Sequence, residues 1–399
     1  MDIDKVSRKL WATISPLVRE YNIDLTLLIR TLSSRPIKAI WINKQAGFNP
    51  KKIETVLKEL GMDIRHLRGE SFIYYTPDNP NTPIFQTGGY YIAEVVNSYL
   101  PFIWRNITGN VLDIAASPGG KTFLIANIYK GRGSIISNEP IRTRRRKLIR
   151  NVIKYALDDV RIAGYRGEKF PITCRFNYIL FDAPCSAIDL LYKRPKEVLK
   201  NITRIKYFSS LQKKVIRRIA ELLAEGGELI YSTCTMTLEE TIDISRSCID
   251  MGLKTIPIRS LPFKTSEAFD PWGTHPELKN TLFILPTENY HGFGGNIGLA
   301  YIARFKKEGK TYLQERCDLG IKYKDEKADT RYASHAYKKI MLSDKTSIDA
   351  IHLDINHIIK LMREKEIEYT GMDKNGKKLI VYGESPMFLA EKISNRLVI

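Results

Sequence analysis

The sequence lacks the features that would indicate a membrane protein or a zinc protein. Although 43% of its 399 residues are hydrophobic, no apolar run reaches the roughly 18 residues that a membrane span requires. The five cysteines form no CxxC pair and the six histidines form no HExxH motif, so the usual spacing of a zinc site is missing. We therefore expect a chain with no membrane span and no metal.

A secretory signal is also missing. The first residues, MDIDKVSRKLW, include acidic side chains and lack the apolar stretch of such a signal. This absence predicts a cytoplasmic protein. In that compartment an odd number of cysteines predicts reduced thiols rather than a disulfide framework. We expect the protein to be a monomer.

Acidic residues are scarce relative to basic ones, with 44 Asp and Glu against 63 Lys and Arg and a net charge of +19. Residues 308–399 contain 17 basic and 15 acidic residues, so nearly all of the excess charge lies in residues 1–307. Such an excess favours a polyanionic partner, usually a nucleic acid. The charge therefore predicts an RNA- or DNA-binding surface in the first three quarters of the chain.

The hydrophobic patterns divide the chain into three parts. Residues 1–80 predict a small α+β subdomain, with helices over Val6–Tyr21 and Asn49–Leu60 around a strand at Ile37–Ile42. Prolines in the segment 75–83 mark its end. Residues 81–307 form the central domain. Residues 306–310 have the composition of a linker, and residues 308–399 predict a C-terminal α+β extension without a motif that we can place.

The central domain alternates short apolar runs with amphipathic stretches, which is typical of a parallel α/β sheet. The expected strands cover residues 111–115, 134–137, 178–181, 228–232 and 298–305. The expected helices cover residues 141–156 and 211–223, the second ending at Gly226 and Gly227. The pattern predicts a doubly wound α/β fold.

The glycine-rich segment Val111–Thr122 reads as a buried strand, a turn of small residues and the start of a helix. It ends in Gly120, Lys121 and Thr122 like a P-loop, but Ala115 stands where that motif needs its first glycine. Glu139 follows the next strand, where nucleotide-binding folds place the carboxylate that accepts the ribose hydroxyls. Turn and acid together favour a cofactor that contains a nucleoside; alternatively, Glu139 only caps the following helix.

Two cysteines come directly after predicted parallel strands. Cys185 lies in the segment DAPCS, which begins at Asp182, and Cys234 lies in the segment YSTCT. Parallel α/β sheets bind their ligands at the carboxyl ends of the strands. A single cysteine there is usually a buried apolar residue, but two at equivalent strand ends favour a catalytic role.

These motifs, in this order, resemble those of the RsmB/NOP/Sun family of S-adenosylmethionine-dependent RNA cytosine-5 methyltransferases. The resemblance covers residues 85–307 and includes DIAASPGGKT, DAPCS and YSTCT, with Glu139 followed at the family's spacing by Arg144, Leu148 and Asn151. It implies a class I methyltransferase (Rossmann-like) sheet, and it implies that residues 1–80 bind RNA. The S-adenosylmethionine site implied by the resemblance comprises Ala115, Ala116, Ser117, Pro118, Gly119, Gly120, Lys121, Glu139, Arg144 and Asp182.

The resemblance also implies a mechanism. Carbon 5 of cytosine is a poor nucleophile, so a thiolate must first add to carbon 6. By resemblance Cys234 is that nucleophile and Cys185 acts in its release. Asp182 is placed to face ring nitrogen 3, for which it would have to carry a proton. The expected function is therefore methylation of carbon 5 of a cytidine in ribosomal or transfer RNA.

The segment 193–218 holds ten basic residues against one acid, Glu197. A solvated helix face would also explain this run, but interleaved Tyr192, Tyr207 and Phe208 favour base stacking. The predicted RNA-binding residues are Lys193, Arg194, Lys196, Lys213, Lys214, Arg217 and Arg218.

Two other functions stay open at this point. The first is a non-catalytic RNA-binding or ribosome-assembly protein, because the loop after Cys185 has lost both family glycines, at Ala187 and Asp189, and Tyr165, Arg166 and Gly167 stand where the family's acid near the adenine is expected. The second is a P-loop NTPase acting on RNA, which Ala115 disfavours.

Overall fold

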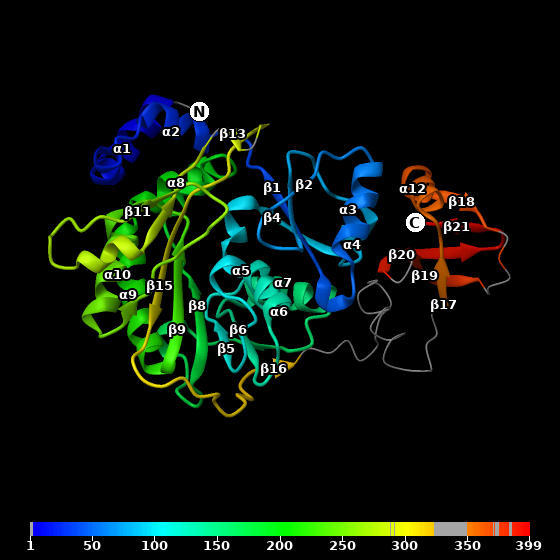
Figure 1. Cartoon of the computed structure of the whole chain (residues 1–399). Helices are drawn as coiled ribbons and strands as arrows, with labels where there is room; N and C mark the ends of the chain where they lie inside the picture. The colour runs from blue at the N-terminus through cyan, green and yellow to red at the C-terminus, as the bar shows by residue number, and fades with distance from the viewer. Residues whose placement is uncertain are drawn as a thin grey trace.

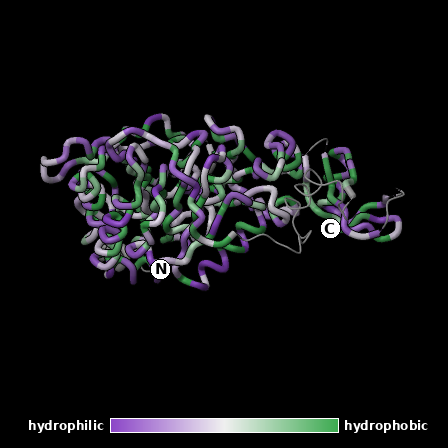
Figure 2. The backbone as a smooth tube through the Cα atoms, turned by 90° about the horizontal axis from the view of Figure 1, so that it is seen from below, coloured by the Kyte–Doolittle hydropathy of each residue, from purple (hydrophilic) through white to green (hydrophobic). Residues whose placement is uncertain are grey.

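The computed structural model describes residues 3–287, 289–290, 292–322, 349–369, 371, 375–382 and 385–399. These residues form an N-terminal part, a central ten-stranded sheet and a C-terminal five-stranded sheet. Figure 1 shows the N-terminal sheet beside the central one, with the C-terminal sheet at the far end of the molecule. The view from below in Figure 2 also shows the C-terminal part at one end of an elongated shape.

The N-terminal part begins with helices α1 (Ile3–Glu20) and α2 (Leu25–Leu32). Its antiparallel sheet has the order β2-β3-β1-β4. These strands and their helices are β1 (Lys38–Ile42), α3 (Pro50–Glu59), β2 (Arg65–His66), β3 (Ile73–Thr76), α4 (Pro83–Gln86) and β4 (Tyr90–Glu94). As the sequence predicts, Asn49 caps α3 by accepting a hydrogen bond from the N–H of Lys52 at 3.2 Å. Because β4 pairs with β1, the N-terminal sheet extends beyond the predicted boundary at residue 80.

The central sheet has the order β11-β12-β15-β9-β8-β5-β6-β7-β16, with β10 attached to β15. The strands β7, β6, β5, β8 and β9 are parallel neighbours, and the remaining pairs are antiparallel. Their bounds are β5 (Val111–Asp113), β6 (Ile135–Asn138), β7 (Val160–Ala163), β8 (Phe176–Asp182), β9 (Leu223–Thr233), β10 (Lys254–Thr255), β11 (Thr265–Glu267), β12 (Leu282–Ile284), β15 (Ala300–Lys306) and β16 (Ile321–Lys322). A separate pair is formed by β13 (Asn289–Tyr290) and β14 (Phe293–Gly294).

Helices cover both faces of this sheet, so its strands are buried on both sides. They are α5 (Leu100–Ile103), α6 (Gly120–Ile128), α7 (Arg142–Lys154), α8 (Pro195–Ile202), α9 (Ile205–Leu222) and α10 (Ile242–Asp250), with short turns η2 (Val95–Tyr99), η4 (Ile188–Leu191) and η5 (Leu238–Glu240). Neighbouring strand residues alternate between two cores: Val111 packs with α6 and the N-terminal sheet, whereas Leu112 packs with α9 and α1. The predicted doubly wound α/β fold is confirmed.

Two details of the predicted helix boundaries are wrong. Helix α9 begins at Ile205, six residues before the predicted start, and gives way to β9 at Leu223. Gly226 and Gly227 lie inside β9 and do not end the helix. Gly226 has φ +66° and its N–H donates to the carbonyl of Lys307. These glycines therefore mark an irregularity inside a long strand. In the sequence, such a glycine pair cannot be distinguished from the end of a helix.

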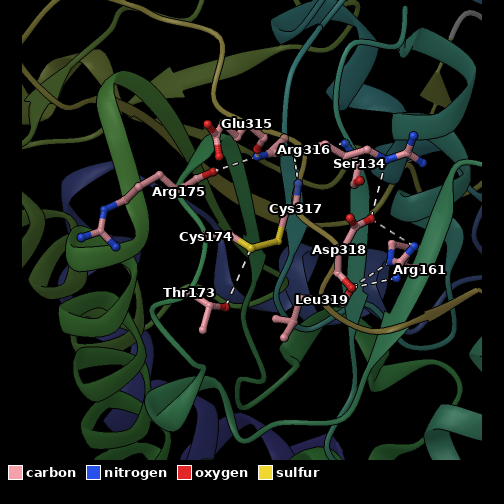
Figure 3. The surroundings of a disulfide bond; sticks show 11 residues. Ser134, Arg161, Thr173, Cys174, Arg175, Glu315, Arg316, Cys317, Asp318 and Leu319 are labelled. Carbon is pink, nitrogen blue, oxygen red and sulfur yellow. Dashed lines mark hydrogen bonds and ion pairs between the residues drawn. A yellow bond between two sulfur atoms is a disulfide. The ribbon is translucent and has the colours of Figure 1, made fainter.

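Residues 307–322 remain on the central sheet, so the predicted linker at residues 306–310 is wrong. The N–H of Lys307 donates to the carbonyl of Gly227, and β16 pairs with β7. In Figure 3 the side chain of Arg161 reaches the carbonyls of Asp318 and Leu319, at 2.7 and 3.2 Å. The domain therefore continues past the predicted boundary after residue 307, because polar side chains on the sheet satisfy this segment's backbone.

A disulfide joins Cys317 of this segment to Cys174, which follows β7 (Figure 3). The expectation that all five cysteines are reduced is therefore wrong for this pair. Sequence spacing gives no hint of it, because the two residues are 143 positions apart. Only the return of the chain along β7 brings them together.

The C-terminal sheet has the order β17-β19-β20-β21-β18. Its elements are β17 (Asp349–His352), α12 (Ile355–Glu364), β18 (Glu366–Glu368), β19 (Gly376–Tyr382), β20 (Ser385–Ile393) and β21 (Arg396–Val398). It contacts the N-terminal part: Arg363 Nη2 donates to the carbonyl of Glu59 at 2.7 Å, and the N–H of Asn49 donates to Ser385 Oγ at 2.9 Å. In the described parts of the chain no helix has the length and apolar character needed to cross a membrane.

The disulfide gives a first testable prediction. Replacing Cys174 and Cys317 with serine removes a cross-link that closes a long loop, and we expect a loss of about 2 to 5 kcal/mol of stability. Thermal melting should show the loss, and a thiol reductant should lower the melting temperature of the wild type but leave that of the double variant unchanged. The cross-link would be contradicted if the reductant left the melting temperature of the wild type unchanged.

Candidate active site

A cavity of about 320 Å³ lies between the carboxyl ends of β5 and β8 and the N-terminal strands β1 and β4. The central domain lines it with Asp113, Ala115, Ala116, Ser117, Pro118, Gly120, Lys121, Asp182 and Lys193, and the N-terminal sheet and its following turn line it with Lys38, Trp41, Tyr91, Ile92, Ala93, Glu94 and Asn97. The cavity brings together most of the residues that the sequence predicts for the cofactor. Ligand sites at this edge are typical of parallel α/β sheets.

The turn after β5 is held by α7. Gly119 has φ +108°, and a Cβ on it would meet Leu148 Cδ1 at 2.9 Å. Arg144 Nη2 donates to the carbonyl of Ser117 at 3.2 Å, and Asn151 Nδ2 donates to the carbonyl of Pro118 at 2.8 Å. The sequence spacing of Arg144, Leu148 and Asn151 therefore has a physical reason: one helix face fixes the turn. This turn presents small residues to the cavity, so a ligand can approach the backbone there.

Glu139 is buried at the start of α7. Its Oε1 accepts the N–H of Ile141 at 2.9 Å, and its Oε2 lies 3.3 Å from Arg144 Nε. Among the described residues, neither Glu139 nor Arg144 belongs to the cavity lining. Glu139 therefore binds the residue that precedes α7 and caps none of the N–H groups of the helix, and the ribose contact of Glu139 stays a prediction.

A chain of polar contacts crosses the floor of the cavity at Asp182, which ends β8. Lys121 Nζ donates to Asp182 Oδ2 at 2.6 Å and to Asn97 Oδ1 at 3.0 Å. Ser232 Oγ donates to Asp182 Oδ1 at 2.7 Å and accepts from the Tyr99 hydroxyl at 2.7 Å. Burial acts to lower the pKa of Lys121, but the charge and hydrogen bond of Asp182, together with Tyr99 and Cys234, raise it, and the pKa lies above its ordinary value. The cavity thus holds an ammonium–carboxylate pair in which both carboxylate oxygens accept hydrogen bonds.

The two predicted catalytic cysteines lie together. Cys185 follows β8 and Cys234 follows β9, and their Sγ atoms are 3.4 Å apart. The hydrogen bond with Cys185, followed by burial, raises the pKa of Cys234 well above its ordinary value. Because Asp182 lies opposite Ser232 in the β8–β9 pairing, both thiols and the carboxylate stand at one edge of the sheet.

The loop after Cys185 keeps its shape without the family glycines. Ala187 adopts the left-handed conformation, with φ +57°, and Asp189 N–H donates to the carbonyl of Cys234 at 3.1 Å. Glu240 Oε1 accepts the N–H of Ser186 at 2.9 Å. The loop is therefore held by hydrogen bonds to its neighbours rather than by glycine.

Several polar residues of the site are missed by the sequence. Ser232 lies inside the YSTCT motif, so the sequence could have indicated it. Its side chain donates a hydrogen bond to Asp182 on the neighbouring strand. Asn97, Lys38 and Glu94 belong to no motif and line the cavity only through the fold, and Tyr99 is buried behind it, where it donates to Ser232. Within the described residues, no group of three or more His, Cys, Asp or Glu side chains is placed to hold a metal ion.

The predicted RNA-binding residues divide into separate groups. Lys213, Lys214 and Arg217 line a second cavity of about 300 Å³ on α9, together with Lys206, Ser209, Ser210, Glu239 and Asp243. Arg218 instead pairs with Glu221 at 2.7 Å, and Lys193 lines the first cavity. Arg194 pairs with Glu197 at 3.3 Å and Lys196 is exposed on α8.

The aromatic residues of this segment differ in exposure. Tyr192 and Tyr207 are exposed, as base stacking requires. Phe208 is buried, so the expectation that it stacks on bases is wrong. Its position follows from the apolar face of α9, which packs on the central sheet.

Known proteins match this chain over the same region. A family model described as "16S rRNA methyltransferase RsmB/F" matches residues 106–293. The tRNA (cytosine(49)-C(5))-methyltransferase of Pyrococcus abyssi is 30% identical over 287 residues, which are 68% of this chain and 89% of that protein. The 28S rRNA (cytosine-C(5))-methyltransferase of Mus musculus is 30% identical over 234 residues, 55% of this chain and 28% of that protein. The chain thus spans most of the archaeal relative and under a third of the mouse one.

Two solved structures share the fold. NSun6 from Pyrococcus horikoshii, solved with SFG, has a TM-score of 0.57 and 18% identity, covering 72% of this chain and 94% of that one. A methyltransferase homolog protein from the same organism has a TM-score of 0.57 and 21% identity, covering 70% and 89%. The central sheet therefore has the class I methyltransferase fold that the sequence predicts.

The contact between the thiols gives a second prediction. In Cys185→Ala the hydrogen bond that most raises the pKa of Cys234 is gone, so Cys234 should become a thiolate at lower pH. We expect iodoacetamide to alkylate Cys234 faster at neutral pH, with the midpoint of the rate-against-pH curve moved to lower pH. Mass spectrometry of the Cys234 peptide measures the rate. Cys248→Ala, which removes a buried thiol in α10, is the control and should not move the curve; an unmoved midpoint in Cys185→Ala would refute the coupling.

Proposed function

The chain belongs to the RsmB/NOP/Sun family of RNA cytosine-5 methyltransferases, and we propose that it methylates cytidine through a covalent bond to Cys234. The observation that carries this proposal is the convergence of two free thiols, 3.4 Å apart, beside Asp182 at the ends of adjacent parallel strands. A pair of buried structural thiols needs no charged Lys121–Asp182 pair and no cavity next to it. This arrangement therefore favours the enzyme over a non-catalytic RNA-binding scaffold.

We propose S-adenosylmethionine as the methyl donor, held by the small residues 115–120. The residues fit such a ligand: the turn is kept free of side chains, since a Cβ on Gly120 would meet the Tyr91 ring at 3.1 Å. The related structure solved with SFG, an analogue of S-adenosylmethionine, supports the same donor. When bound, the sulfonium supplies an electrophilic methyl group and departs as a neutral thioether, so the protein needs only to position it.

The first chemical step is addition of the Cys234 thiolate to carbon 6 of the cytosine. The electrons of the carbon 5–carbon 6 double bond move into the ring, so carbon 5 becomes nucleophilic and negative charge gathers at ring nitrogen 3. The Lys121 ammonium and Asp182 are the groups that face this charge. Since Lys121 is held charged by Asp182, it is the donor that stabilises the adduct.

After carbon 5 receives the methyl group, it still carries its proton. In our proposal the Cys185 side chain, as a thiolate, accepts that proton; the released electron pair restores the double bond and expels Cys234 as a thiolate. The short distance between the two sulfur atoms places the accepting group beside the bond that breaks. The proton then returns to solvent from Cys185, and the enzyme is restored.

We propose a cytidine in ribosomal or transfer RNA as the substrate. Relatives named for both kinds of RNA match the chain, and the net charge of +19 suits a polyanion. The N-terminal part (residues 1–80) and the basic cavity on α9 are the proposed RNA contacts outside the active site.

The reaction predicts opposite effects for the two cysteines. Cys234→Ala should form neither 5-methylcytidine nor a protein–RNA adduct, because nothing adds to carbon 6. Cys185→Ala should still add and methylate but release slowly, so an adduct resistant to denaturation should accumulate on a gel. Bisulfite sequencing of RNA reports the methylation. Cys248→Ala should turn over normally, and an adduct formed by the double variant Cys185→Ala, Cys234→Ala would overturn the roles.

The basic cavity on α9 predicts a change in salt dependence. Replacing Lys213, Lys214 and Arg217 with glutamine should lower the slope of log affinity against log salt for single-stranded RNA by about 2, at about 0.7 for each lost contact. Arg218→Gln on the same helix is the matched control, because Arg218 pairs with Glu221. Equal slopes for the wild type and the triple variant would mean that these residues only form a solvent-exposed helix face and do not bind RNA.

A further inference from the structure

The rim of the active-site cavity carries two lysines that the proposed chemistry does not use. Lys38 comes from β1 and Lys193 from the turn between η4 and α8, and both line the cavity. Glu94 of β4 lies opposite Lys38 in the β1–β4 pairing, and its Oε1 pairs with Lys193 Nζ. Ammonium groups from two parts of the chain therefore surround one carboxylate at the mouth of the cavity.

The net charge around Lys38, Lys193 and Glu94 also depends on Asp189, a second carboxyl group beside Glu94. Asp189 is buried, and its Oδ1 accepts the N–H of Leu299 at 2.6 Å. Burial, followed by the charge of Glu94, raises the pKa of Asp189 well above its ordinary value. Its raised pKa favours the neutral form of the Asp189 side chain beside the Glu94 carboxylate.

The ammonium groups of Lys38 and Lys193 also repel each other. Burial, followed by the charge of Lys193, lowers the pKa of Lys38, and Glu94 compensates in part. An anion placed between the lysines would remove this repulsion and add two charge-assisted hydrogen bonds. The rim is therefore suited to a singly charged anion.

The charged side chains of the cavity differ in exposure. The Lys193 side chain is 42% exposed and that of Asp182 is 39% exposed, whereas those of Lys121 and Glu94 are each 11% exposed. A cytidine whose ring reaches Lys121 extends its sugar and phosphate toward the more exposed Lys193. The lysines at the rim then lie where the backbone of that nucleotide passes.

We propose that Lys38 and Lys193 form a subsite for an RNA phosphodiester next to the target cytidine. The subsite rests on the proposed function, because its occupant is a nucleotide turned out of its stack. Turning out a base costs a few kcal/mol, and contacts to the adjacent phosphate offset that cost only when the base is in the cavity. Since each part of the chain supplies one lysine, the N-terminal sheet completes the active site rather than only adding affinity elsewhere.

The test uses the full chain and a short oligouridine RNA with one cytidine, followed by fluorescence anisotropy at low salt. Lys38→Gln and Lys193→Gln should each weaken binding about 3- to 10-fold and lower the salt slope by about 0.7. Neutral methylphosphonate linkages on either side of the cytidine should weaken binding to the wild type by a similar factor. They should have little further effect on the double variant, since the charge they remove has lost its partners. Lys38→Arg should restore the slope.

Matched controls remove a charge outside the cavity and outside residues 1–80: Lys264→Gln and Lys200→Gln on α8, both exposed. Effects equal to theirs would reduce the lysine pair to general surface charge and overturn the subsite. A loss of S-adenosylhomocysteine affinity by calorimetry, with RNA binding unchanged, would assign the lysines to the cofactor carboxylate and also overturn it, as would failure of the wild type to bind the oligonucleotide. Anisotropy does not depend on methyl transfer, so intact binding without 5-methylcytidine would contradict the proposed reaction alone.

Discussion

The parallel pairing of β8 with β9, with Asp182 opposite Ser232, is the constraint on which the rest of the site depends. It brings the segments that follow the two strands to the same edge of the sheet, so Cys185 and Cys234 meet although 49 residues separate them. It also gives Asp182 a hydrogen bond from Ser232. A shift of one residue in this register would turn these side chains to opposite faces and separate the thiols from the carboxylate.

The Lys121–Asp182 pair joins this edge to the cofactor loop. Lys121 begins α6 after the glycine turn, and α7 fixes that turn through Arg144, Leu148 and Asn151. Removing Asp182 would leave the Lys121 ammonium, whose side chain is only 11% exposed, without its counter-ion, which is costly. The glycine turn after β5 and the sheet edge that carries the two thiols are therefore positioned by one continuous set of contacts.

The departures from the family motif are absorbed by neighbouring contacts. Asp189 stands where the family has glycine, yet its backbone and side chain bond to Cys234 and Leu299 and so fix the loop to β15. The same residue, being buried beside Glu94, sets the charge balance at the cavity rim. A change in the motif thus carries a consequence for the substrate side of the cavity.

The sequence by itself determined the α/β class, the positions of β5, β6, β8, β9, β15 and α7, part of α9, and the residues at the ends of β5, β8 and β9. Local periodicity and turn chemistry are enough for these, because each depends on neighbours along the chain. It did not determine the Cys174–Cys317 disulfide, the attachment of residues 307–322, or the entry of Lys38, Glu94 and Asn97 into the cavity. These depend on contacts between residues far apart in sequence, and such contacts are decided only when the two cores pack on the faces of the sheet.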